Sequence, residues 1–575
     1  MTKLLKYFKS YLKETILAPL FKLFEAILEL FIPLIVAAII NTGIKNSDKT
    51  YIVLMVCLMV GLGLLGLGFS ILGQYFSAKS SVGYCTKVRH DLFEKLQNLT
   101  FSQIDRLGTS SMITRITYDV NQVQTGINLT LRLLLRSPFV VFGATIIATV
   151  LLPSRAYIFW LMLLVLSIIV FGIMLISIPL HKKVQNNLDI VLNNTRENLT
   201  GVRVIRAFGV EEKEINTYTS STKNLQKSQN KVGRISNLMN PLTYIIVNIA
   251  IILLVYVGAF DVFDGVILQG TLIAIYNYMA QILVELIKLA NLIITITKSL
   301  ASSKRILNIL IMDSTEILTQ EEKKENISYI TFDHVALKYS QASMESLTDI
   351  DFTVDKGDVI GIIGGTGSGK TSLVGLLNRS YDVSEGTLYI DGYNINNYTP
   401  SLIREKIGYV LQKAVIFKGT IRDNIKWGNP DATDEEIIDA LEKAQALNVV
   451  MKKPGGLDEM VEQNGRNFSG GERQRLSIAR ALVKKPEILI LDDSSSALDL
   501  LTEKALRKSI FNLDYKPTIF IVSQRTSSIM HATKIIVLDD GKIVGIGTHD
   551  ELLNNCEVYQ EIYYSQYKKE DNDYE

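Results

Sequence analysis

Apolar residues dominate the first half of the chain, in runs long enough for a helix to cross a bilayer. A spanning helix needs ~20 mostly apolar residues. Runs of this kind predict about six spans, near residues 15–42, 51–76, 129–152, 157–180, 241–260 and 267–295. The basic N-terminal stretch leads into a run too long for the apolar core of a signal peptide, so we interpret it as the leader of a retained helix.

Basic residues gather in two of the connections between these runs. The long connections after the second and fourth runs are rich in Lys and Arg, whereas the other three are short and hold few. The positive-inside rule therefore predicts a cytoplasmic N-terminus, with both long connections and the second half of the chain on the same side. Both long connections repeat apolar residues at helical spacing, which predicts membrane helices that extend into the cytoplasm and are joined by short turn helices.

The pattern changes in the second half of the chain. The stretch MDSTEILTQEEKKENIS, residues 312–328, is polar and charged, as is typical of a linker. From Tyr329 onward, apolar runs of strand length alternate with helical patterns, which predicts a parallel α/β domain. The expected division is a membrane domain at 1–311, a linker at 312–328 and an α/β domain at 329–575.

Length and composition agree with this division. A chain of 575 residues is too long for one hydrophobic core, and 48% hydrophobic residues are too many for a purely soluble protein. The formal net charge of +2 argues against nucleic acid as a partner. The three cysteines are widely scattered, which is typical of reduced structural thiols.

The strongest chemical motif lies in GDVIGIIGGTGSGKTSLVGLL. A hydrophobic strand leads into Gly364-x-x-x-x-Gly369-Lys370-Thr371, and an apolar-periodic helix follows. The glycines allow backbone N–H groups to curl around phosphate oxygens, and the start of the helix adds partial positive charge. Lys370 can neutralise the β- and γ-phosphates, and the Thr371 hydroxyl can bind Mg²⁺.

Two further motifs follow along the chain. In NFSGGERQRLSIARAL, the turn Ser469-Gly470-Gly471 opens a helix and offers a second group of free N–H donors to an anion. In ILILDDSSSALD, a buried strand ends in Asp492 and Asp493. Two acids at the end of such a strand indicate one for a metal ion and one for chemistry.

These ordered motifs resemble the nucleotide-binding domain of an ATP-binding cassette (ABC) transporter. The whole chain resembles a half-transporter of the multidrug-exporter type, which implies a helical membrane domain of six transmembrane helices fused to an α/β P-loop cassette that binds ATP and Mg²⁺. The positions that match the family's nucleotide contacts are Tyr339, Gly364, Gly365, Thr366, Gly367, Ser368, Gly369, Lys370, Thr371, Ser372, Asp492, Ser469, Gly470, Gly471, Glu472 and Asp499.

The resemblance also implies a role for each motif. Tyr339 matches the aromatic residue that stacks on adenine, Ser469 to Glu472 the signature motif, and Asp499 the D-loop acid. Thr371, Gln412 and Asp492 match the positions that hold Mg²⁺, and Gln412 also matches the glutamine that couples the cassette to the membrane domain. Such families need two cassettes, because each ATP lies between one domain's Walker A loop and its partner's signature.

Two positions depart from the family pattern in the same chemical step. Asp493 stands where the family has a catalytic glutamate, and Gln524 stands where its switch has a histidine. An aspartate carboxylate is set back by roughly 1 Å, and a misplacement of that size can cost about 10²-fold in rate. Gln524 can hydrogen-bond a phosphate but cannot become cationic. His531, seven positions later, is not expected to reach the same phosphate.

The signature motif, by contrast, is whole. A weakened base with a sound signature resembles the degenerate-site subunit of heterodimeric bacterial exporters. This resemblance implies ATP-driven efflux of drugs or other amphipathic compounds across the cytoplasmic membrane, with hydrolysis mainly at the site that the partner's Walker motifs complete. A lipid or peptide exporter, a homodimer with two slow sites and a regulatory module gated by ATP remain open alternatives.

Charged and polar residues also occur within the predicted spans, where they are costly. They are Lys22, Glu25, Glu29, Arg132, Arg136, Asn248, Glu285 and Lys288. One interpretation is a partly polar cavity on the transport pathway. The other is pairing between helices or subunits, or snorkelling near a span end. The sequence favours neither.

Overall fold

The computed structural model describes residues 2–312, 322–325, 327–340 and 342–567. They form two compact units, and each is described here by itself. The first unit comprises Met1–Asn98 and Thr109–Met312, and the second comprises Leu99–Gly108 together with Asp313–Glu575. The predicted linker at 312–328 falls largely on residues 313–321 and 326, which lie outside the described residues.

The first unit is helical. Six of its segments are long and apolar enough to cross a membrane, namely Lys6–Ile44, Lys49–Gln97, Thr109–Leu151, Pro153–Thr200, Glu211–Phe263 and Gln269–Leu310. Each overlaps one of the six predicted apolar runs, so the expected number of six apolar helices is confirmed. Most of these segments are far longer than the ~20 residues that a bilayer requires, as the helical periodicity of the connections predicts.

Several of these six segments consist of two or more consecutive helices. Chain order gives α1 (Thr2–Leu5), η1 (Lys6–Tyr11), α2 (Leu12–Ala38), η2 (Ile39–Ile44), α3 (Lys49–Gln97), α5 (Thr109–Thr114), η3 (Arg115–Asp119), α6 (Val120–Leu133), α7 (Arg136–Leu151), η4 (Pro153–Arg155), α8 (Ala156–Thr200), α9 (Val202–Phe208), α10 (Glu211–Asn237), α11 (Met239–Phe263) and α12 (Gln269–Leu310). Helix α9 is a short turn helix of the kind predicted for the second long connection.

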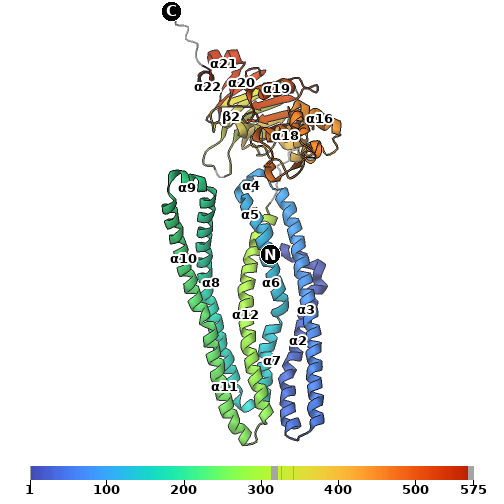
Figure 1. Cartoon of the computed structure of the whole chain (residues 1–575), viewed down its shortest axis with the longest axis vertical. Helices are drawn as coiled ribbons and strands as arrows, with labels where there is room; N and C mark the ends of the chain where they lie inside the picture. Colours follow the sequence, from blue (N-terminus) through green and yellow to red (C-terminus); the bar gives the residue numbers. More distant parts are fainter. Residues whose placement is uncertain (1, 313–321, 326, 341, 568–575) are drawn as a thin grey trace, which may run out of the picture. The chain divides into compact units, whose positions relative to one another are not determined.

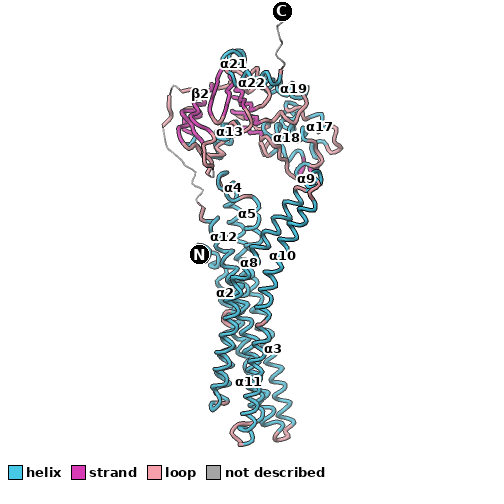
Figure 2. The backbone as a smooth tube through the Cα atoms, turned by 90° about the vertical axis from the view of Figure 1, so that its left-hand side faces the viewer, coloured by secondary structure: helices cyan, strands magenta, loops and turns pink. Residues whose placement is uncertain are grey.

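The long helices pack side by side. Helix α2 runs along α3, α8 runs along α10 and α11, and α12 packs on α6 and α7 (Figures 1 and 2). Large fully buried side chains, including those of Phe159, Tyr278 and Met279, fill the core between them. The buried Tyr278 hydroxyl donates to the backbone oxygen of Leu30, 2.5 Å away, and so satisfies its polar atom inside this core.

Six charged side chains from α2, α7 and α12 form one network inside the first unit. Arg136 is at its centre, with Nη1 2.6 Å from Glu285 Oε1 and Nη2 2.5 Å from Glu29 Oε2. Lys288 also binds Glu285 at 2.7 Å. Lys22 binds Glu25 at 2.5 Å, and Glu25 lies 3.8 Å from Arg136 Nε. Three cations therefore face three anions, and the set is neutral.

This network bears on the two interpretations of the intramembrane charges. Arg136 of α7 pairs with Glu25 and Glu29 of α2 and with Glu285 of α12, so the geometry supports pairing between helices for these four residues, whereas Lys22 and Lys288 form ion pairs within their own helices. Asn248 donates to the backbone oxygen of Tyr244 on its own helix. Among the described residues, the Nε atoms of Arg132 and Arg136 are both buried with no hydrogen-bond partner.

The second unit is an α/β domain with three sheets. A six-stranded sheet has the order β12-β11-β3-β10-β9-β6, a four-stranded sheet the order β2-β1-β4-β5, and β7 pairs with β8. The strands are β1 (Ile330–Leu337), β2 (Leu347–Val354), β3 (Val359–Gly364), β4 (Glu385–Ile390), β5 (Tyr393–Asn394), β6 (Ile407–Val410), β7 (Gly419–Thr420), β8 (Met460–Val461), β9 (Ile488–Asp492), β10 (Thr518–Val522), β11 (Lys534–Asp539) and β12 (Lys542–Gly547).

The six-stranded sheet is parallel except for its antiparallel edge strand β12. Every residue of β9 and β10 is buried, which explains why both strands are continuous apolar runs without alternation. The helices around the sheets are α13 (Lys370–Leu377), α14 (Pro400–Lys406), α15 (Ile421–Lys426), α16 (Asp434–Lys443), α17 (Leu447–Met451), α18 (Gly470–Leu482), α19 (Leu500–Phe511), α20 (Thr526–Ile529), α21 (His549–Asn555) and α22 (Glu557–Gln566), with short turns η5 (Ile395–Asn397), η6 (Gly456–Asp458) and η7 (Gln463–Gly465).

A short helix from the first long connection, α4 (Phe101–Leu107), belongs to the second unit. Asp105 accepts a 2.7 Å hydrogen bond from the Tyr381 hydroxyl, and the Phe101 ring lies 6.2 Å from that of Tyr381. The Arg404 guanidinium lies over the Phe101 ring, 5.7 Å from its centre. These contacts explain why residues 99–108 group with the α/β domain although they interrupt the first unit in sequence.

Candidate functional site

Four adjacent parallel strands bring the predicted site residues to one edge of the sheet. The glycine-rich loop follows β3, Gln524 follows β10, Asp492 ends β9, and Gln412 lies two residues beyond β6. The carboxyl ends of parallel strands meet at one edge, where α/β sheets bind their ligands. Strand order therefore gathers residues that are more than 150 positions apart in the sequence.

The loop between β3 and α13 is held in shape by Lys370. Its Nζ donates to the backbone oxygens of Gly364 at 2.9 Å and Gly365 at 2.5 Å, and lies 3.3 Å from Ser368 Oγ. Burial lowers the pKa of Lys370, because the charged form loses hydration. No side chain caps the start of α13 in this described segment, so its first N–H groups remain available to an anion.

Gly369 has a backbone that only glycine adopts easily. Its φ is 96°, and an added Cβ would lie 2.7 Å from Leu347 Cδ2 and 2.9 Å from the Ser346 oxygen. Conformation and close packing thus both demand glycine at the point where the loop turns into the helix.

Asp492 and Thr371 form a cluster of oxygen ligands. Thr371 Oγ1 donates to Asp492 Oδ1 at 3.1 Å, and the Tyr409 hydroxyl donates to Asp492 Oδ2 at 3.2 Å. Burial raises the pKa of Asp492 above its usual value, and the nearby Asp493 adds to the shift. A hydroxyl and a carboxylate are the ligand types that Mg²⁺ prefers, so these residues fit that ion.

Asp493 follows β9 in a left-handed conformation, with a φ of 45°. Asparagine and aspartate tolerate this region better than other residues with side chains. Its Oδ2 accepts a 3.2 Å hydrogen bond from Gln412 Nε2. The backbone N–H of Asp493 donates to the Val522 oxygen at 3.0 Å, which ties it to the strand that precedes Gln524.

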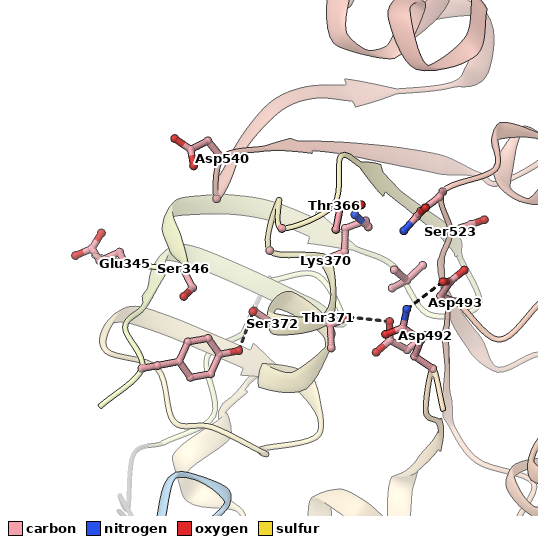
Figure 3. A pocket seen from close by; sticks show the side chains of 17 residues that line it. Glu345, Ser346, Thr366, Lys370, Thr371, Ser372, Asp492, Asp493, Ser523 and Asp540 are labelled. Atoms are coloured by element: carbon pink, nitrogen blue, oxygen red, sulfur yellow. Dashed lines mark hydrogen bonds between the residues drawn. The ribbon is translucent and has the colours of Figure 1, made fainter. Parts of the chain in front are cut away.

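A cavity of about 440 Å³ opens over these groups. The predicted residues that line it are Tyr339, Thr366, Gly367, Gly369, Lys370, Thr371, Ser372, Gln412, Asp492, Asp493 and Gln524. Glu345 and Asp540 lie toward one end of the cavity and Asp492 and Asp493 toward the other, with Lys370 between them (Figure 3). The predicted motifs therefore line one cavity together, with acidic side chains toward both ends of it.

The Tyr339 ring in the cavity lining is fixed by two contacts. Its hydroxyl lies 2.8 Å from Ser372 Oγ, a bond drawn in Figure 3, and its ring meets that of Tyr381 edge to face at 4.8 Å. Because Tyr381 also binds Asp105 of α4, the contacts form a chain from α4 to the cavity wall.

The signature residues and Asp499 lie outside this cavity lining. Ser469 and Glu472 form a capping box at the start of α18, with Ser469 N donating to Glu472 Oε2 at 2.7 Å. Asp499 caps α19 by accepting from Thr502 N at 3.0 Å. Within this chain, the signature residues and Asp499 therefore act as helix caps. A ligand that contacts them would have to be bound outside this cavity.

Sequence reasoning missed several residues that line the cavity or hold its acids. They are Glu345, Ser346, Tyr409, Ser523, Asp540 and Gly541. Tyr409 could have been found, because it lies in a strand three residues before Gln412. Nothing in the sequence marks Glu345 or Asp540, whose loops reach the site only through strand pairing.

Two family models match the chain. The model described as ABC transporter transmembrane region matches residues 15–286, and the model described as ABC transporter matches residues 347–496. The uncharacterized ABC transporter ATP-binding protein YfiB of Bacillus subtilis is 33% identical over 570 residues, which cover 99% of each chain.

The chain belongs to the ABC transporter family.

This ABC transporter has further relatives. The putative multidrug export ATP-binding/permease protein YgaD of Bacillus subtilis is 30% identical, and the match covers 98% of each chain. The solved structure of a bacterial Atm1-family ABC exporter with ATP bound superposes with a TM-score of 0.80 at 23% identity, over 98% of this chain and 99% of that one. That likeness confirms the predicted fold, a six-helix membrane domain fused to a cassette. The cassette of this family binds ATP, generally with Mg²⁺.

Proposed function

We propose that this transporter chain is one half of a heterodimeric exporter that moves drugs or other amphipathic compounds out across the cytoplasmic membrane of a bacterium. The name of the relative YgaD supports multidrug export. The basic residues of the two long connections support a cytoplasmic N-terminus and cassette. In this proposal the membrane domain covers 1–311, a linker covers 312–328 and the cassette covers 329–575.

The cavity of the cassette would hold ATP along its length. Tyr339 would stack on adenine, the loop from Gly364 to Ser372 would surround the phosphates, and Lys370 would exchange its bonds to loop oxygens for β- and γ-phosphate oxygens. Thr371, Asp492 and Gln412 would hold Mg²⁺, which supplies positive charge to the phosphates when bound. The fit of Thr371 and Asp492 to that ion supports this assignment.

The observation that carries the proposal is the position of Asp493. Its short carboxylate is held by Gln412 at 3.2 Å, and the switch position beside it is a glutamine. General-base catalysis is worth roughly 10²–10⁴-fold and needs hydrogen-bond reach to the attacking water. A carboxylate set back by roughly 1 Å loses much of that reach. This chain would therefore bind MgATP well and hydrolyse it slowly.

The signature motif gives this chain its second role. Ser469 to Glu472 stand at the start of α18, outside this chain's own cavity. The capping box binds the N–H groups of Ser469 and Glu472, and those of Gly470 and Gly471 are the donors left for an anion. They would complete the site that the partner's Walker motifs form, while the partner's signature closes this one with Asp499 beside it. Hydrolysis would occur mainly at the partner's site, and ATP sandwiching would switch the membrane helices between inward- and outward-facing states.

The test is to measure ATPase activity of this chain alone and together with candidate partner half-transporters, all in lipid nanodiscs. We expect weak turnover by the chain alone and strong turnover by the correct pair. In the pair, replacing the partner's catalytic glutamate should abolish turnover, whereas Asp493→Ala should leave most of it.

The alternatives predict other outcomes. Strong turnover by the chain alone, lost on Asp493→Ala, would show a homodimer with competent sites. Weak turnover with every partner, combined with tight ATP binding, would favour a regulatory module gated by ATP. Uptake assays in inverted vesicles, with cationic dyes, lipids and peptides compared, separate the substrate classes.

A further inference from the structure

The loop that carries Gln524 is held by a side chain from the end of the chain. Gln566, the last residue of α22, donates from Nε2 to the Gln524 backbone oxygen at 2.7 Å. Its Oε1 accepts from the Thr526 backbone N–H at 2.9 Å and lies 3.0 Å from Thr526 Oγ1. One amide thus brackets the loop with both of its polar atoms.

These bonds give partners to two backbone groups of the loop, the Gln524 carbonyl and the Thr526 N–H. Thr526 is the first residue of α20, and the preceding Arg525 provides no side-chain cap. The first N–H groups of a helix have no partner within it, and a capping side chain normally supplies one. Gln566 supplies this cap from 40 residues away, at a Thr526 that is fully buried.

Helix α22 is itself fixed to the cassette. Tyr559 is fully buried, and its hydroxyl lies 2.7 Å from His549 Nδ1. Gln560 Nε2 donates to the Leu553 backbone oxygen at 2.8 Å, which links α22 to α21. Gln566 therefore extends from an anchored helix, and its two polar atoms hold the loop in a fixed position relative to that helix.

Glu503 of α19 holds two further residues that follow Gln524. This carboxylate is buried, with 5% of its surface exposed, and binds Arg525 Nη1 at 3.2 Å and the Ser528 hydroxyl. With the Gln524 carbonyl and the residues after it held, the Gln524 side chain is exposed and lines the cavity.

We propose that Gln566 is a positioning residue that sets how this chain's ATP site distinguishes ATP from ADP, by fixing the loop that presents Gln524 to the γ-phosphate. The inference rests on the proposed role of Gln524. Gln566 itself touches no nucleotide in this account. Its donor fixes the carbonyl of Gln524, and its acceptor fixes the start of α20.

The experiment uses the full-length chain in lipid nanodiscs with Mg²⁺. Affinities for ATP and ADP are measured by displacement of trinitrophenyl-ATP, and the readout is the ratio of the ADP Kd to the ATP Kd. Gln566→Leu removes both polar atoms, and we expect the ratio to fall about threefold to tenfold. Gln566→Glu keeps the acceptor but loses the donor, so it should give an intermediate ratio. Ser565→Ala removes only a bond local to α22, from the Ser565 hydroxyl to the Ile562 backbone oxygen; it is the matched control and should leave the ratio unchanged.

A double variant distinguishes positioning from general damage. If Gln566 acts through Gln524, then Gln524→Ala and the double variant Gln524→Ala/Gln566→Leu should give the same ratio. Additive effects, or an equal fall with Ser565→Ala, would overturn the positioning role. An unchanged ratio in Gln566→Leu beside a lowered ratio in Gln524→Ala would overturn it too, and would leave the proposed function standing. An unchanged ratio in Gln524→Ala would refute both the role of Gln524 and the inference built on it.

Discussion

The Tyr381 hydroxyl donates a 2.7 Å hydrogen bond to Asp105, although 276 positions separate the two residues in the sequence. Asp105 lies in α4, between helices α3 and α5 of the membrane unit, and Tyr381 touches Tyr339 at the wall of the nucleotide cavity. A change at the cavity wall can therefore reach the segment that joins two membrane helices through two aromatic rings.

Breaking this bond should uncouple the cassette from transport. Tyr381→Phe keeps the ring contacts and removes one bond to a carboxylate, so we expect ATP binding to stay normal while transport per ATP falls severalfold. Parallel assays of nucleotide affinity and dye uptake in inverted vesicles measure this. Tyr329→Phe is the control, because Tyr329 makes an equivalent 3.0 Å bond to Glu487 that does not involve α4. Equal losses in both variants would contradict the prediction.

Within the intramembrane charge network, Arg136 should be essential for the stability of the protein and Lys288 should not. Arg136→Met leaves Glu285 and Glu29 without their main partner, and removing one member of a buried pair costs about 3–5 kcal/mol. We expect a large fall in the melting temperature in detergent. Lys288 binds the same Glu285 but is 42% exposed, so Lys288→Met should cause little change. A similar melting temperature for both variants would show that the network does not depend on Arg136.

Lengthening Asp493 should restore catalysis at a cost in stability. Asp493→Glu with Gln524→His should raise turnover at this chain's site by roughly tenfold to hundredfold, since the base regains its reach. The left-handed φ of 45° tolerates aspartate better than glutamate, and the exchange should lower the free energy of unfolding by about 1 kcal/mol. Single-turnover ATPase with the partner's catalytic glutamate replaced isolates this site. No gain in that assay would mean that another step limits it.

On acidification, Mg²⁺ binding at this site should begin to weaken at a higher pH than it would with an aspartate of ordinary pKa. Burial raises the pKa of Asp492 above 3.8, and only the ionised carboxylate binds the cation. As the pH falls through that raised pKa, protonation competes with Mg²⁺, so the affinity for MgATP should fall while the affinity for metal-free ATP changes less. Titrations with and without EDTA measure this difference. Asp492→Asn, which cannot titrate at this position, should reduce the difference between the two pH profiles.

The sequence predicts the parts of this molecule that depend on local pattern. Apolar runs predict the six spans, and glycine spacing predicts the loop before Lys370. Pairing across the fold leaves no such pattern. Spacing places Arg136 and Glu285 within spans but does not reveal that they meet, and a lone glutamine at 566 gives no sign that it caps Thr526. The same reason hides Asp540 and Glu345, which reach the cavity through strand order.

Helix α4 also decides how the cassette behaves when it is taken out of the chain. A fragment that begins after the membrane helices leaves residues 99–108 behind and bares the surface around Tyr381 and Arg404 that Phe101 covers. Such a fragment should be prone to self-association through this aromatic patch. A synthetic peptide of residues 99–108 should bind there and return the fragment to a monomer, so the cassette is best regarded as a domain assembled from two separate pieces of sequence.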